Sequence, residues 1–334
     1  MRASVGLPTL DKTRPRFAAG HRLAMYIAVV MLSVCISLFY KYRTDTIFAC
    51  PANGYSDDAY LAYCNAKSYA DYEHGAFAFD LEPAAIDFAR KAEVLFLGNS
   101  HMQVAFSTPI TSDWFSAAST RYYLMGFSYG ENLVFAEYLL PKVRPQASVY
   151  VINVDDFFID SETPPTEPIL HDPEARHRYE DKHFWQSVHW QVCGRFPMLC
   201  GSDGVIFRSR KTGAFTERTA PLKTEPVSYD EVEDQNAVKI ETANAIEFMR
   251  HLPKQGKCVI LTTVPTVGTK VADAAAIAKG VGLELVTPGN LRGLSTYDGS
   301  HLDSPSAERW SKAFFGVAGP KILSCLDREV PAHR

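Results

Sequence analysis

The chain has 334 residues, of which 46% are hydrophobic and 22% charged, a composition that supports a packed core and excludes wholesale disorder. The formal net charge is −4, but residues 1–43 hold seven basic residues and one acidic residue, which leaves residues 44–334 strongly acidic. An acidic body repels a phosphate backbone, so we expect no nucleic-acid partner.

The first predicted element is a membrane-spanning helix over residues 23–40 (LAMYIAVVMLSVCISLFY), an uncharged segment between Arg22 and Lys41. As a helix it spans about 27 Å, close to the hydrocarbon thickness of a bilayer. The basic leader, residues 1–22, favours a cytoplasmic N-terminus, so the body lies outside the cytoplasm. We expect a single-pass anchor in the inner (cytoplasmic) membrane with a periplasmic body. A cleaved signal peptide is the alternative, for which this apolar segment is long.

Six cysteines follow the span, an even number available for pairing in an oxidising compartment. Two pairs are close in sequence and lie in loop-like segments, so we expect disulfides Cys50–Cys64 and Cys193–Cys200. Neither pair has the spacing and neighbouring histidines of a zinc site, which makes the metal interpretation weaker. The other two are expected to be buried, unpaired small side chains: Cys258 at the start of a strand and Cys325 at the end of a helix.

The body alternates apolar strands with amphipathic helices. Strands are predicted over residues 93–97, 122–125, 148–154, 257–264 and 283–286. Helices are predicted over residues 83–91, 131–143, 229–252, 270–280 and 304–326. Continuous apolar strands separated by helices are typical of an α/β fold with a mostly parallel sheet covered on both faces.

We divide the body into a membrane-proximal segment, residues 44–90, and a main domain, residues 91–330. Between about residues 157 and 228 the alternation stops, which indicates an insertion at the carboxyl edge of the sheet, where α/β sheets bind ligands. Four histidines in it recur every six residues, a spacing that does not keep them on one helical face: His171, His177, His183 and His189. We interpret them as solvated or substrate-contacting side chains, with a metal cluster as the minority alternative, and expect no metal or other cofactor.

Two short blocks carry the chemistry. The strand ending at Leu97 is followed by Gly98-Asn99-Ser100, a turn that presents a serine hydroxyl, although such a serine is also a common helix N-cap. After the last strand comes Asp298-Gly299-Ser300-His301. A serine needs a base to become nucleophilic, and a neutral imidazole needs a carboxylate to orient it. Asp298 and His301 supply both from one loop at the same sheet edge as Ser100.

With these blocks the sequence resembles the SGNH (GDSL-like) hydrolase superfamily, whose first block is a Gly-Asp-Ser turn and whose last is Asp-x-x-His. Asn99 replaces the family's Asp, and the resemblance covers about residues 92–315. It implies a three-layer α/β/α flavodoxin-like sandwich with Ser100 as nucleophile, His301 as base and Asp298 as orienting acid.

The resemblance also implies an oxyanion hole built from the serine's own N–H, a glycine after the second strand and an Asn after the third. The glycine corresponds to Gly126, with Gly130 as the alternative. Either Asn153 supplies the third donor with a shifted frame, or Asp155 stands there, and an ionised Asp disfavours an oxyanion. The expected donors are therefore Ser100, Gly126 and Asn153.

An anchored SGNH-like body also resembles the membrane-tethered SGNH proteins that partner multi-span O-acyltransferases in modifying bacterial cell-surface polymers. This implies O-acyl (acetyl) transfer or ester removal on an envelope or secreted polysaccharide, with such a multi-span acyltransferase as partner. The alternatives are a simple periplasmic carbohydrate esterase or lipase, and a non-catalytic polysaccharide-binding or assembly protein. Four tryptophans have either a sugar-stacking role or the commoner packing role: Trp114, Trp185, Trp190 and Trp310.

Overall fold

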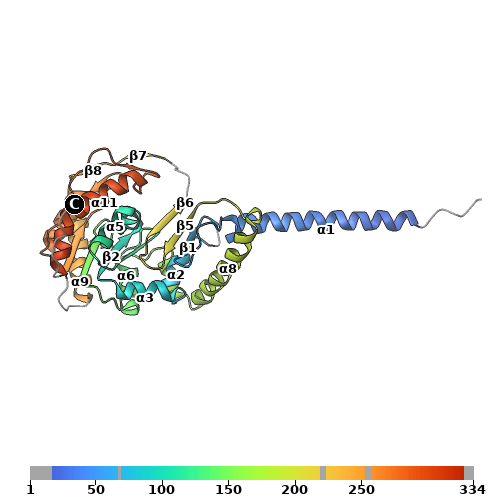
Figure 1. The fold of residues 1–334 in the computed structure, drawn as a ribbon, viewed down its shortest axis with the longest axis horizontal. Helices are drawn as coiled ribbons and strands as arrows, with labels where there is room; N and C mark the ends of the chain where they lie inside the picture. The colour runs from blue at the N-terminus through green and yellow to red at the C-terminus, as the bar shows by residue number, and fades with distance from the viewer. Residues whose placement is uncertain (1–16, 67–68, 219–222, 253–257, 327–334) are drawn as a thin grey trace, which may run out of the picture.

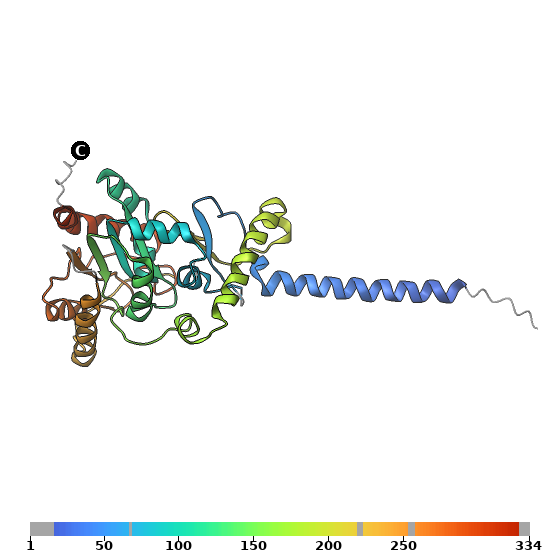
Figure 2. The same ribbon diagram turned by 90° about the horizontal axis from the view of Figure 1, so that it is seen from below.

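The computed structural model describes residues 17–66, 69–218, 223–252 and 258–326. Helix α1 (Phe17–Asp45) extends from the body as one long rod (Figures 1 and 2). Its segment Leu23–Tyr42 is long and apolar enough to cross a membrane, and none of it is buried against the body. The predicted span lies inside this helix, whereas the first sixteen residues of the basic leader lie outside the described residues.

The central sheet is parallel, with strand order β3-β2-β4-β9. Its strands are β2 (Val94–Asn99), β3 (Tyr122–Phe127), β4 (Val149–Asn153) and β9 (Cys258–Thr262). The predicted mostly parallel sheet is confirmed. The strand predicted over residues 283–286 does not form. Only Leu285 of this described segment pairs with the sheet, through an isolated parallel bridge to Leu261. The strand order reverses between β2 and β4, the position at which α/β sheets commonly bind ligands.

Helices cover both faces of this sheet (Figures 1 and 2). One face packs against α4 (Ser100–Phe106), α5 (Pro109–Ala117) and α11 (Ser304–Cys325). The other packs against α3 (Pro83–Lys91), α6 (Leu133–Val143), α9 (Gln235–His251) and α10 (Val271–Gly280). Successive strand residues point to opposite faces. Phe96 therefore joins the first core, and Leu95 and Leu97 join the second.

The helix predicted over residues 229–252 begins later than expected, at Gln235. The preceding residues form the short strand β8 (Tyr229–Asp230), which pairs with β10 (Thr269–Lys270). Asp234 is the N-cap of α9, and its side chain accepts hydrogen bonds from two backbone N–H groups of the first turn. Helix α9 therefore starts at its Asp234 cap, because the residues before the cap pair with a distant strand.

Residues 157–228 fold largely against the membrane-proximal segment. Strands β5 (Val205–Ser209) and β6 (Phe215–Arg218) join β1 (Ala59–Cys64) in an antiparallel sheet of order β1-β5-β6. Helix α7 (Thr166–His171) leads into α8 (Ala175–Arg195), which packs on α2 (Tyr72–Ala78) and on the short helix η1 (Ile47–Ala49). The segment predicted as an edge insertion thus shares a core with residues 44–90 for most of its length.

A buried ion pair joins these two segments to the central sheet. Arg208 of β5 donates to Glu73 of α2 at 2.9 Å and to the Leu124 carbonyl of β3 at 2.7 Å. The Arg208 and Glu73 side chains are at most 1% exposed, and Glu73 also accepts two hydrogen bonds from Ser128. A buried charge without its partner is strongly destabilising, so arrangements that separate Arg208 from Glu73 are disfavoured.

We expect Arg208→Ala to lower the free energy of unfolding by about 3–5 kcal/mol, because it leaves the Glu73 carboxylate buried without its counter-charge. Chemical denaturation of the detergent-solubilised protein measures this loss. The matched control is Arg121→Ala, which removes a pair between the exposed Arg121 and the partly exposed Glu93 and should cost at most about 1 kcal/mol. Equal stability losses in the two variants would contradict the role assigned to Arg208.

The disulfides Cys50–Cys64 and Cys193–Cys200 are present, as predicted. The prediction that Cys258 and Cys325 are unpaired is wrong, because these residues form a further disulfide with Cα atoms 5.9 Å apart. Helix α11 packs on β9 and brings its last residue to the first residue of that strand. A bridge between residues 67 positions apart depends on this packing and leaves no local signal.

Peptide mapping without reduction should recover the Cys258 peptide linked to the Cys325 peptide, together with both short-range bridges. The protein must come from its native compartment with thiols blocked at lysis. Recovery of Cys258 and Cys325 as alkylated free thiols would contradict the third bridge.

Candidate active site

Strand β2 delivers Ser100 to the carboxyl edge of the sheet. Gly98 allows close packing there, since a Cβ at this position would lie 3.0 Å from the Met102 side chain and 3.1 Å from that of Asn153. Asn99 is the N-cap of α4 and accepts a hydrogen bond from the His101 N–H at 3.0 Å. The cap position is therefore filled by Asn99, and the Ser100 hydroxyl is available for another partner.

That partner is His301, in the loop that leads into α11. The His301 Nε2 atom lies 2.8 Å from Ser100 Oγ, and its Nδ1 atom lies 2.7 Å from Asp298 Oδ2. The other carboxylate oxygen of Asp298 accepts the backbone N–H groups of Ser300 and His301. Gly299 turns the loop with a φ of +87°, a left-handed conformation that favours glycine. The structure thus brings together Ser100, His301 and Asp298 with the bonding order of a Ser-His-Asp triad.

Asp298 is held in its ionised form. Burial alone would raise the pKa of this carboxyl, but hydrogen bonds from the His301 ring and backbone, with a further one from Ser300, bring the pKa down to about 2. A carboxylate that stays charged at neutral pH fixes the proton on His301 Nδ1 and leaves Nε2 free to accept a proton from Ser100.

A second serine, histidine and aspartate lie beside the triad and form the same kind of hydrogen-bonded series: Ser300, His101 and Asp155. His101 Nδ1 lies 2.5 Å from Asp155 Oδ2, and His101 Nε2 lies 2.5 Å from Ser300 Oγ. Burial favours the neutral ring of His101, but its hydrogen bond to Asp155 and the nearby carboxylates outweigh burial and raise the pKa of the imidazole. The sequence analysis gave His101 and Ser300 no role. The feature that could have indicated this second series is a Ser-His dipeptide in each block, at residues 100–101 and 300–301.

Two of the three predicted oxyanion donors, Gly126 and Asn153, have other partners in this structure. The Gly126 N–H donates to Gln103 Oε1 at 3.1 Å. The Asn153 side chain is fully buried, where its amide nitrogen lies 3.4 Å from Asn99 Oδ1 and its oxygen accepts the Val264 N–H. These two groups therefore need a local rearrangement before either could bind an oxyanion.

The two alternatives for the oxyanion positions are also placed by the structure. Gly130, with a φ of +65°, lies in the turn after β3, where an added Cβ would meet no neighbouring atom within 4 Å. Asp155 lies just beyond β4, and its carboxylate is paired with His101. A paired, negatively charged Asp155 is unsuited to bind an oxyanion directly.

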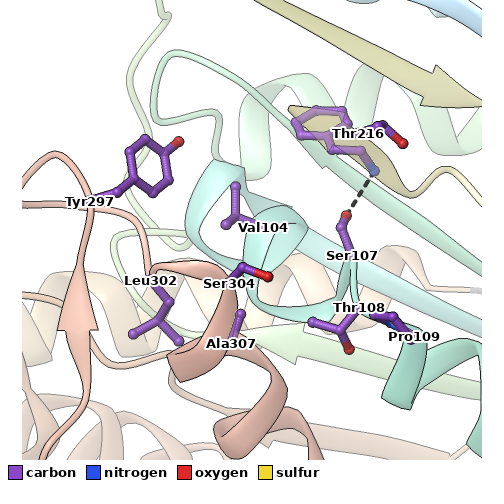
Figure 3. Close-up of a pocket in the computed structure, with 10 residues that line it drawn as sticks. Val104, Ser107, Thr108, Pro109, Thr216, Tyr297, Leu302, Ser304 and Ala307 are labelled. Atoms are coloured by element: carbon purple, nitrogen blue, oxygen red, sulfur yellow. Dashed lines mark hydrogen bonds between the residues drawn. The ribbon is translucent and has the colours of Figure 1, made fainter. Parts of the chain in front are cut away.

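A cavity of about 300 Å³ lies beside the loop that carries His301. Tyr297 and Leu302 of this loop line it, whereas the triad residues themselves do not (Figure 3). Its lining includes Tyr297, whose ring stacks on that of His301 with centroids 5.7 Å apart. Phe215 and Thr216 of β6 line it too, and the Phe215 N–H donates to Ser107 Oγ at 2.8 Å. Among the described residues of 157–228, those of β6 line this space, whereas α8 packs on η1, next to α1 (Figure 1).

The regularly spaced histidines have separate partners. His171 pairs with Glu162, His177 with Asp181, His183 with the Tyr72 hydroxyl, and His189 with the Cys50 carbonyl and the Tyr55 hydroxyl. Ligand atoms of His189, Cys193 and Cys200 do lie within 4.8 Å of one another. Because the two cysteines form a disulfide and both nitrogens of His189 are hydrogen-bonded, we assign no metal to this group.

The tryptophans divide into two kinds. Trp310 is buried in the core, and Trp114 stacks on Phe315 of α11, so both have packing roles. Trp185 and Trp190 are 44% and 43% exposed on α8, where Trp185 contacts Phe48 and Trp190 stacks on Tyr55. Both tryptophans of α8 therefore contact aromatic residues of the membrane-proximal segment, residues 44–90.

No family model, curated protein or solved structure matches this chain.

Proposed function

We propose that this protein is a membrane-anchored, extracytoplasmic serine O-acyltransferase or esterase that acts on a cell-envelope or secreted polysaccharide. The observation that carries the proposal is the continuous hydrogen-bonded series Ser100–His301–Asp298 at the switch point of a parallel α/β sheet. The strand order and the helices on both faces support an SGNH-type sandwich as its fold.

In the proposed reaction His301 Nε2 takes the Ser100 proton as Oγ attacks the acyl carbon of the donor ester. The proton then passes to the departing alcohol, which leaves the acyl group on Ser100. Asp298 stabilises the imidazolium throughout. In the second half-reaction His301 activates either water or a sugar hydroxyl, and the proton returns to Ser100 Oγ. The cavity beside Tyr297 is the space that we assign to the acyl or sugar group.

Location outside the cytoplasm is part of the same proposal. It is supported by the basic leader before an apolar helix and by disulfides, which persist in oxidising compartments. An anchor holds the body at the membrane and raises its effective concentration for a membrane-bound partner. A multi-span acyltransferase that delivers acyl groups to Ser100 fits this arrangement.

Transfer and hydrolysis differ in what reacts with the acylated serine. A transferase must favour a sugar hydroxyl over water, which requires binding energy from the rest of the glycan. We therefore expect the full chain in detergent to hydrolyse p-nitrophenyl acetate slowly. Added envelope oligosaccharide should accelerate p-nitrophenol release and become acetylated.

Mass spectrometry of the oligosaccharide measures this transfer, with Ser100→Ala as the control that should yield no acetylated product. Rapid hydrolysis of acetylated glycans, without acylated acceptor for any envelope sugar tested, would favour the simple esterase instead.

A non-catalytic polysaccharide-binding protein is the second candidate, favoured by the partners of Gly126 and Asn153 described above. A protein of this kind would bind the glycan with equal affinity in wild type and Ser100→Ala and would show no serine-dependent ester cleavage. Isothermal titration alongside the hydrolysis assay separates the two candidates.

A further inference from the structure

Two Ser-His dipeptides meet at this site, and each serine is bonded to the histidine of the other dipeptide. Ser100 bonds to His301, and Ser300 bonds to His101. The two imidazole rings lie edge to face with centroids 5.1 Å apart. The site therefore contains two hydroxyl–imidazole pairs within one small region.

The two sets match atom for atom. In both, the Nε2 atom faces the serine hydroxyl and the Nδ1 atom faces a carboxylate, Asp298 in one set and Asp155 in the other. The side chains of His101 and His301 are 20% and 19% exposed. This orientation fixes the neutral ring in the tautomer that can accept a serine proton.

We propose that Ser300 is a second nucleophile, with His101 as its base and Asp155 as the orienting acid. The inference rests on the proposed function for its substrate class, acyl esters. In the step, Ser300 Oγ bonds to the acyl carbon while the ester C–O bond breaks. The proton moves from Oγ to His101 Nε2 and then to the departing alcohol, so no other reactant is needed.

Ser300 should react more slowly than Ser100. Its own backbone N–H donates to Asp298 Oδ1 at 2.9 Å, so this group is occupied and cannot stabilise an oxyanion formed at Ser300. The loss of one oxyanion donor typically costs about a hundredfold or more in rate, and we expect a difference of that order between the serines.

The test is covalent labelling of the full chain in detergent with a fluorophosphonate, followed by peptide mapping. We expect rapid modification of Ser100 in wild type and, in Ser100→Ala, about a hundredfold slower modification of Ser300. The Ser100→Ala/Ser300→Ala double variant should not be labelled within residues 298–301. Ser100→Ala/Ser324→Ala is the control, because Ser324 is an exposed serine of α11 that does not line the cavity, and it should label like Ser100→Ala.

Asp155→Asn in the Ser100→Ala background tests the base. It retains the side-chain shape but removes the charge that orients His101, so labelling of Ser300 should slow at least tenfold while the thermal unfolding curve stays close to that of Ser100→Ala. A serine that reacts merely because it is exposed would label at an unchanged rate.

The inference is overturned if wild type labels at Ser100 while Ser300 stays unmodified in Ser100→Ala after prolonged exposure. An unchanged labelling rate in the Asp155→Asn double variant would also overturn it. If wild type fails to label at Ser100, the proposed function fails first. Labelling of Ser300 in that case would still support a Ser300–His101–Asp155 nucleophile.

Discussion

Ser100→Ala should lower the rate of p-nitrophenyl acetate hydrolysis by about a thousandfold or more, because a triad acts as a unit and loses most of its rate with any core member. The Ser100 hydroxyl is the one bonded to His301, and alanine removes it without adding volume. Initial rates of the full chain in detergent measure the effect. Any residual rate should fall further when Ser300 is also replaced.

The control for this prediction is Ser187→Ala. Ser187 is an exposed residue of α8 outside the cavity, and its hydroxyl donates to the Phe184 carbonyl. Its replacement should change kcat less than a few fold. Equal rates in wild type and Ser100→Ala would refute the assignment of the nucleophile.

His301→Ala should cost about as much as Ser100→Ala, since the serine then has no base in position. Asp298→Asn should cost roughly ten to a hundred times less, because the imidazole remains but loses the carboxylate that fixes its tautomer. Asp298 accepts hydrogen bonds from the His301 ring and from two backbone N–H groups, so the substitution also loosens the loop.

The same assay measures both variants, with kcat and KM determined separately. We expect the loss in kcat and little change in KM, because these groups act on the reacting atoms. A His301→Ala variant that retains at least a tenth of the wild-type kcat would show that another group activates Ser100.

Local sequence patterns were enough to predict many of the helices and strands and the three residues of the candidate triad. The strand predicted over residues 93–97 was recognisable as a continuous apolar run before Gly98, and it overlaps β2. The helix from Ser304 follows a clear start signal. Asp298 and His301 lie three residues apart in one loop, so a turn alone could bring carboxylate and imidazole together. Features of this kind need no knowledge of distant packing.

Other features depend on contacts between distant segments. The antiparallel sheet pairs β1 with β5 across more than 140 residues, so residues 157–228 could not be assigned to residues 44–90 from their pattern. The bonds from His101 to Asp155 and Ser300, and from Gly126 to Gln103, depend on where side chains of different elements meet. Residue type and spacing along the chain do not specify such pairings.

The most direct test of the central claim is to identify the first residue modified when the wild-type full chain reacts with a fluorophosphonate probe. Intact mass gives the stoichiometry, and peptide mapping at short reaction times gives the site. The proposed active site predicts one adduct on Ser100 at early times, abolished at that position by Ser100→Ala and strongly slowed by His301→Ala. A wild-type protein that remains unmodified at Ser100 while folded would contradict the account.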